Sequence, residues 1–209
     1  MYGYGMYGFL DPTFLLVILG LVISGIASAY VNSTFRKYDQ VRSKNNVTGT
    51  QAAQYILQSQ QINNVGVQQI AGDLTDNYNS GNKMLSLSQA TAQSTSVAAI
   101  GVAAHECGHA IQHNVNYAPL NIRSAIVPVA NLGSSLSWPI FVLGLILSIP
   151  TLTTAGIVLF SLAVLFQLVT LPVEFNASSR ALKMLESTGI LSHDENKGAR
   201  KVLTAAALT

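Results

Sequence analysis

A run without ionisable side chains, residues 124–173, constrains this chain of 209 residues more than any other feature. It contains no Asp, Glu, Lys, Arg or His. One helix of that length would extend about 75 Å, against a bilayer hydrocarbon core of about 30 Å. Two spans joined by a tight turn fit instead. We therefore predict a transmembrane helical hairpin, with spans near residues 125–149 and 152–171 and the turn at Pro150 and Thr151.

A second apolar segment without charge, residues 14–31, lies near the N-terminus. With Pro12 and Thr13 it reaches the length of about 20 residues that a membrane span needs. A cleaved signal peptide is the alternative, but the basic residues that normally precede its apolar core are absent. Across the chain 10% of residues are charged, against about a quarter in soluble domains. These features predict a mainly α-helical, multi-pass membrane protein, with an N-terminal membrane helix in residues 1–35.

Basic residues next to the apolar segments predict how the chain crosses the membrane, because cytoplasmic loops are enriched in Lys and Arg. After the first span come Arg36, Lys37, Arg42 and Lys44. Arg123 precedes the hairpin, and Arg180 and Lys183 follow it. We therefore expect the N-terminus outside and residues 36–123 and 174–209 in the cytoplasm. A net charge of only +2, without an Arg/Lys-rich patch, argues against nucleic acid as a partner.

The long polar region between the first span and the hairpin is expected to form a small α+β part. A helix is predicted over about residues 50–60, followed by strands over residues 65–70 and 83–88. The composition of residues 76–82 predicts a turn between the strands. Apolar residues from position 97 onward surround the helix axis, which is typical of a buried core helix.

The tail, residues 174–209, is expected to form two further helices. The first covers residues 175–187, and Gly189 is its expected C-terminal stop. Ser192 and Glu195 have the spacing of a capping box, which predicts the start of the second helix.

The predicted buried helix carries the sequence His-Glu-Cys-Gly-His at residues 105–109. His105 and His109 lie four residues apart and share one helix face, so both imidazoles can reach one zinc ion. Glu106 would flank that ion and act as base toward a water molecule. The alternative is a helix whose two histidines are ordinary polar residues. Cys107, the single cysteine, allows no disulfide, and packing is its expected role.

A zinc site of the protease type needs a third protein ligand. His113 would lie about 12 Å from His105 if the helix continues, too far to share an ion. Glu174 ends the charge-free run, and the hairpin carries it back to the side of the membrane where His105 and His109 lie. Its alternative role is a charge that marks the lipid boundary. The remaining carboxylates are less attractive: Asp73, Asp76, Glu186, Asp194 and Glu195.

Several stretches resemble the YugP-type family of membrane-bound neutral zinc metallopeptidases and, more distantly, the HtpX-like and CAAX-prenyl endopeptidase gluzincins. They are residues 74–78, 85–88, 102–112, 117–120 and 171–178. The resemblance implies a gluzincin-like catalytic part and a Zn²⁺ ion held by His105, His109 and Glu174. It also implies that Glu106 is the general base.

Two features depart from these families. The HtpX-like enzymes carry an Asp four residues after the ligand Glu, where it supports a zinc-bound His, and this chain has Ser178 there. YugP-like chains continue into one more hydrophobic helix after a segment like residues 205–209. We therefore expect this sequence to stop before a last membrane span.

The expected function is hydrolysis of peptide bonds at the cytoplasmic membrane face, by a membrane-embedded zinc metalloendopeptidase acting on peptides or membrane proteins. Strand 84–88 is a candidate edge for an extended substrate. Arg180 and Tyr117 are candidates for stabilising the oxyanion. Two alternatives stay open: a membrane adaptor with a structural zinc site, and a zinc hydrolase of a lipid or small molecule. The sequence carries no signal for an oligomeric state.

Overall fold

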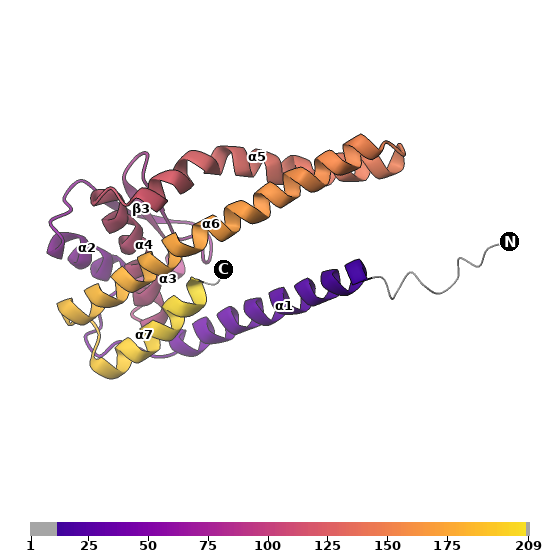
Figure 1. Cartoon of the computed structure of the whole chain (residues 1–209). Coiled ribbons are helices and arrows are strands. Elements are labelled where there is room, and N and C mark those ends of the chain that lie inside the picture. The colour runs from indigo at the N-terminus through magenta and orange to yellow at the C-terminus, as the bar shows by residue number, and fades with distance from the viewer. Residues whose placement is uncertain (1–11, 208–209) are drawn as a thin grey trace.

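Three long helices extend in the same direction from a compact part that holds the remaining elements (Figure 1). The computed structural model describes residues 12–207, so the first eleven residues of the predicted N-terminal segment lie outside the described part. The elements in chain order are α1 (Pro12–Asp39), α2 (Gly49–Ser59), β1 (Gly66–Ile70), β2 (Asn77–Asn79), β3 (Met84–Ser88), α3 (Gln89–Gln93), α4 (Val97–Asn114), α5 (Ala118–Ile146), α6 (Pro150–Thr188) and α7 (His193–Ala206).

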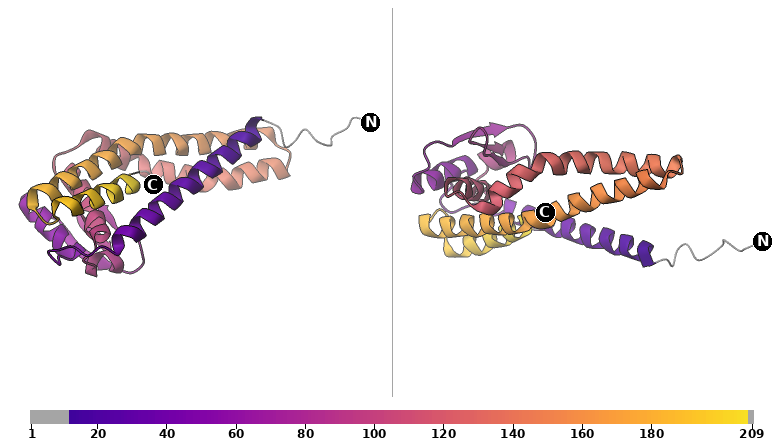
Figure 2. Two further views of the ribbon diagram at one scale, coloured as in Figure 1. Left: turned by 90° about the horizontal axis from the view of Figure 1, so that it is seen from below. Right: turned by 45° about the horizontal axis from the view of Figure 1, so that its top comes forward.

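The three long helices α1, α5 and α6 are long and apolar enough to cross a membrane. Helices α5 and α6 pack along one another and join through a tight turn, at the place where the charge-free run predicted a hairpin. In Figures 1 and 2 the start of α1 and the hairpin turn lie at the same end of the molecule. This arrangement fits one bilayer around the three helices, with the compact part at its surface.

Helix α6 corrects one prediction. Residues 175–187 are not a separate helix but the last part of α6, which continues through Pro172. Proline is tolerated within membrane helices because neighbouring groups satisfy the freed backbone atoms. Gly189 ends α6 with φ 65°, as predicted. The capping box formed by Ser192 and Glu195 at the start of α7 is also confirmed.

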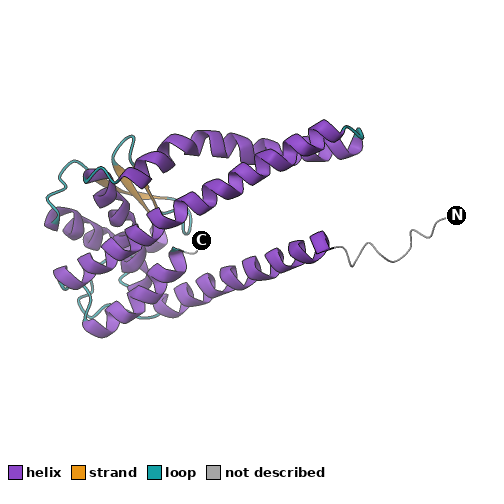
Figure 3. Ribbon diagram, viewed as in Figure 1, coloured by secondary structure: helices purple, strands orange, loops and turns teal. Residues whose placement is uncertain are grey.

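Figure 3 shows the small sheet in orange within the compact part. Its strand order is β1-β3-β2, with β1 parallel and β2 antiparallel to β3. Strand β3 is therefore the centre of the sheet, and the prediction that it offers a free edge to a substrate is wrong. The segment predicted as a turn contains the short edge strand β2, in which Tyr78 pairs with Leu85. The sequence did not predict this strand because Asn, Ser and Gly, which are typical of turns, dominate the segment.

Helix α4 is the core helix, as its apolar sequence predicted. It is buried along nearly its whole length and packs against α2, α6 and α7. Ser96 caps its first turn, where the side chain accepts a hydrogen bond from the Ala99 amide. At Gly108 the helix lies so close to α6 that an added Cβ would collide with the Ala177 carbonyl. This contact fixes the separation of the two helices next to residues 105–109 and Glu174.

Candidate metal centre

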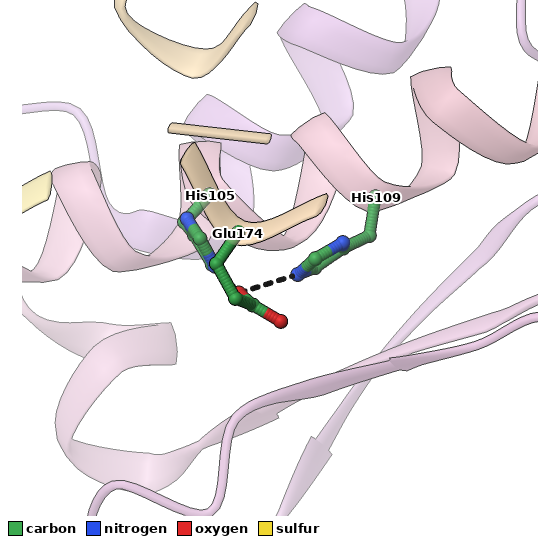
Figure 4. Close-up of side chains that lie close together, drawn as sticks. All are labelled: His105, His109 and Glu174. Carbon is green, nitrogen blue, oxygen red and sulfur yellow. Dashed lines mark hydrogen bonds and ion pairs between the residues drawn. The ribbon is translucent and has the colours of Figure 1, made fainter. Parts of the chain in front are cut away.

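Helices α4 and α6 bring three potential ligands together (Figure 4). His105 and His109 lie on one face of α4, and Glu174 faces them from α6. Glu174 Oε2 lies 3.1 Å from His105 Nε2 and 3.3 Å from His109 Nε2. The ligand atoms of the three residues all lie within 4.8 Å of one another. Within residues 12–207, no other group of His, Cys, Asp and Glu side chains has a geometry that could hold a metal ion.

The donor set fits zinc. Zinc binds imidazole nitrogen and carboxylate oxygen at about 2.0–2.2 Å, so tetrahedral ligands lie about 3.3 Å apart. The two observed separations of 3.1 and 3.3 Å agree with that value. Three protein ligands leave one position for water or substrate, as in catalytic rather than structural zinc sites.

Ser178 orients the first imidazole. Its hydroxyl donates to the Leu203 carbonyl at 3.1 Å. The hydroxyl therefore accepts from His105 Nδ1–H, also at 3.1 Å, which leaves Nε2 free to bind a metal. Ser178 lies four residues after Glu174 on α6, so both residues contact His105 from the same helix. Through the Leu203 carbonyl, α7 helps to hold Ser178 in place beside His105.

Gln112 orients the second imidazole, a role that sequence reasoning missed. The side chain is 0% exposed. Its Oε1 accepts from His109 Nδ1–H at 3.0 Å, while its Nε2 donates to the Val173 carbonyl at 2.8 Å and to Asn176 Oδ1 at 3.0 Å. Gln112 thus links His109 to the turn of α6 that carries Glu174. A signal was present, because a polar residue three positions after His109 on an apolar helix shares its face.

Arg123 is a second residue whose role the sequence did not reveal. Its Nη1 lies 2.9 Å from Glu174 Oε1, the carboxylate oxygen that faces away from the two imidazoles. The ion pair holds Glu174 so that only Oε2 points at the histidines. The sequence assigned Arg123 only a role as a basic residue at the start of the hairpin.

Three other sequence candidates lie outside the metal group. His113 Nδ1 is hydrogen-bonded to Tyr78 Oη at 2.7 Å, so His113 is a polar residue near the end of α4. The Arg180 guanidinium lies 5.8 Å from the centre of the Tyr117 ring, and its Nε donates to Asn176. Neither Arg180 nor Tyr117 lines the cleft that contains the three potential ligands. The structure therefore gives neither residue a contact with a reacting group.

Glu106 and Cys107 lie beside the potential ligands but in different surroundings. Burial raises the pKa of the Glu106 carboxyl above its ordinary value, and the imidazoles of His109 and His105 oppose that effect. Glu106 lines the cleft. Cys107 is fully buried, and its thiol points at the Ala53 carbonyl of α2, at 3.6 Å. Burial raises the pKa of this thiol, so it stays protonated and serves packing.

A cleft of about 1170 Å³ contains the potential ligands and Glu106. Residues from α1, β2, α4, α5, α6 and α7 line it. The metal group therefore lies in the wall of a large cleft.

Three helices able to cross a membrane and a His-His-Glu group in a cleft are the features of a membrane protein with a metal site of the catalytic type. The family described as "Putative neutral zinc metallopeptidase" matches residues 13–209. The chain belongs to this family, and zinc is its cofactor.

A protein of Bacillus subtilis (strain 168) is a relative, named "Putative membrane protease YugP". It is 43% identical to this chain over 194 residues, which cover 93% of this chain and 86% of that protein. No solved structure matches the chain. The matches confirm the resemblance to the YugP-type neutral zinc metallopeptidases, and with the three long helices they support a location in a membrane.

Proposed function

We propose that this protein is a zinc endopeptidase of the gluzincin type, which cleaves peptide bonds at the cytoplasmic face of the membrane. His105, His109 and Glu174 hold the metal in this proposal. The observation that carries it is the convergence of their ligand atoms within 4.8 Å, beside Glu106 and in one cleft. The family to which the chain belongs supports the reaction class.

Each side chain of the site has a distinct task in the proposed reaction. A bound zinc ion supplies Lewis acidity, which lowers the pKa of a water molecule and polarises a carbonyl. Glu106 would be the general base that takes a proton from the attacking water and passes it to the leaving amine. Gln112 and Ser178 hold the two imidazoles with Nε2 directed at the metal position. Arg123 holds Glu174 by its other oxygen.

The position of Glu174 along α6 supports a site at the membrane surface. Glu174 follows the first residue of α6 by about 36 Å of helix at 1.5 Å per residue. The hydrocarbon core is about 30 Å thick, so Glu174 lies just beyond it when the hairpin turn lies at the opposite face. The basic residues near the compact end of the long helices favour the cytoplasm for this side.

The chief alternative is a membrane adaptor with a structural zinc site. Structural zinc sites are closed by four protein ligands. Here the group has three candidate ligands and faces a cleft of about 1170 Å³, which supports catalysis. An adaptor also has no use for a carboxylate placed like Glu106.

The test compares Glu106→Gln with the wild-type protein, both purified in detergent, for zinc content and cleavage of casein. The expected result is full zinc content with cleavage reduced by at least about 100-fold, the lower range for loss of a general base. Glu186→Gln is the matched control, since this exposed glutamate side chain is paired with Arg200 at 3.5 Å and, within residues 12–207, does not line the cleft. Cleavage of casein by the Glu106→Gln protein at the wild-type rate would refute the mechanism.

A further inference from the structure

The cleft around the proposed metal ligands extends between α1 and α6 toward the interior of the membrane. Its walls include Ser28 and Asn32 of α1 and Gln167 of α6, together with Glu174. Gln167 precedes Glu174 by seven residues, which places it about 10 Å closer to the hairpin turn. The volume of about 1170 Å³ exceeds the range of about 300–1,000 Å³ that small-molecule sites occupy. The space therefore suits a larger occupant.

Helix α1 turns a polar face toward this cleft. Ser24, Ser28 and Asn32 are spaced by four residues, share one face of the helix, and all line the cleft. Leu21 and Ile26 lie outside the cleft walls and are 69% and 65% exposed. Polar side chains on a membrane helix normally face protein or a water-filled cavity. The cleft side of α1 thus combines these three polar side chains with the apolar Ala27, Val31 and Phe35.

Helix α1 does not close the cleft against the hairpin. It packs mainly on α4 and α7, and Figure 1 shows it diverging from α5 and α6 away from the compact part. The side chains of Ser28, Asn32 and Gln167 form no hydrogen bond with any other part of the chain within residues 12–207. Within the described part of the chain, the donors and acceptors of these three side chains thus have no protein partner.

An unwound polypeptide is the occupant that needs such groups inside a membrane. A peptide bond must leave its helix to be hydrolysed, and lipid offers no partner for its N–H and C=O groups. Ser, Asn and Gln side chains supply both donors and acceptors. An acyl chain needs neither, and an intact helix already satisfies its own backbone.

We propose that the substrate is a membrane-spanning segment of another protein, which enters the cleft between α1 and α6 and unwinds there. This inference rests on the proposed function and specifies its substrate class. The polar residues of α1 and α6 hold the unwound backbone, and the metal site lies at the cytoplasmic end of the same cleft.

The first experiment measures selectivity. Full-length protein in lipid nanodiscs is given two probes, casein and a reporter protein with one apolar span of ~20 residues. In the double variant Ser28→Leu, Asn32→Leu the ratio of reporter to casein cleavage should fall about tenfold, the effect of losing two ordinary hydrogen bonds. The matched control is the double variant Ala29→Leu, Ser33→Leu, at neighbouring exposed positions outside the cleft walls, which should keep the wild-type ratio.

The outcomes separate this inference from the proposed function. If the wild-type protein cleaves casein but not the reporter, the substrate class is wrong and the peptidase stands. If the wild-type protein cleaves neither probe, both the proposed function and the substrate class are wrong. An unchanged ratio in the Ser28→Leu, Asn32→Leu variant also overturns the inference.

A binding experiment covers the case in which that double variant does not fold. A photoreactive amino acid is placed at position 28 or 29 of the Glu106→Gln protein, in nanodiscs that contain the reporter. Crosslinks to the reporter should form from position 28 and not from position 29. Crosslinks from position 28 to phospholipid alone would assign the cleft to lipid and overturn the inference.

Discussion

Replacing Gln112 by leucine removes three hydrogen bonds while it nearly conserves the side-chain volume. Gln112 is 0% exposed and connects His109 to the Val173 carbonyl and to Asn176. Leucine has no polar atom, so the buried His109 and Val173 carbonyl and the half-buried Asn176 each lose a hydrogen bond. The substitution thus tests whether the second imidazole depends on its support from α4 and α6.

The expected size follows from the two roles of the side chain. Loss of a partner that orients a metal-binding histidine weakens metal affinity by about 10–100-fold, which corresponds to about 1.4–2.8 kcal/mol. Each buried polar group left without a partner costs about 1–3 kcal/mol of stability. We therefore expect Gln112→Leu to weaken zinc binding by at least about tenfold and to lower the unfolding temperature.

Competition with a chromophoric zinc chelator at neutral pH measures the affinity of the purified protein. Asn114→Leu, exposed at the end of α4, is the matched control and should change the affinity by no more than about twofold, as surface substitutions do. Gln112→Glu keeps the acceptor for His109 but loses the donor to α6, so it should retain more zinc affinity than Gln112→Leu. A folded Gln112→Leu protein with wild-type zinc affinity would refute the reasoning.

Three further predictions concern the contact between α4 and α6, the third ligand and the start of α7. Gly108→Ala should destabilise the protein by about 1–3 kcal/mol and lower its zinc content, because the new methyl group collides with the Ala177 carbonyl and separates the helices; thermal melting and metal analysis measure both effects. Glu174→Ala should lose most of its zinc by metal analysis, because two imidazoles alone then hold the ion. The pKa of Glu195 lies below its ordinary value, because hydrogen bonds from Ser192 and the Lys44 amide outweigh the opposite effect of burial. Glu195→Gln should therefore lower the melting temperature at neutral pH by about 2–4 °C, the effect of about 1 kcal/mol. That difference should shrink as the pH falls below about 4.3, the ordinary pKa of a glutamate, and disappear at a pH below the lowered pKa of Glu195 in the folded protein, where its carboxylate is also protonated.

Distinct results would contradict each of these predictions. A Gly108→Ala protein that melts like the wild type would mean that α4 and α6 can separate without cost. A full zinc complement in Glu174→Ala would remove this residue from the site. A Glu195→Gln deficit that persists at low pH would mean that the carboxylate charge is not what stabilises the start of α7.

The motif helix and the hairpin could be predicted because their signals are local. The apolar residues around position 97 specify a buried helix whatever packs against it, and a run without charge can only be accommodated by apolar surroundings. Glu174 followed from the same logic, since a hairpin must return its end to the side from which it left. The structure brings Glu174 to the two histidines as that topology predicted.

The supporting residues could not be predicted in the same way, because their partners lie far away in the sequence. Gln112 and Arg123 are both polar residues near helix ends. Gln112 shares a helix face with His109, but nothing local shows which side chains or carbonyls either residue contacts. Their roles depend on contacts across 61 residues for Gln112 with Val173, and on the return of Glu174 for Arg123. The prediction of a turn over residues 76–82 was wrong because pairing of β2 with β3 overrides a composition that is typical of turns.

X-ray absorption at the zinc edge of the purified wild-type protein tests the proposed ligand set most directly. His105, His109 and Glu174 predict a first shell of nitrogen and oxygen at about 2.0–2.2 Å, with the outer scattering of two imidazole rings. A sulfur shell at about 2.3 Å would place Cys107 on the metal, and the absence of imidazole scattering would exclude the two histidines. Either result would contradict the metal centre described above.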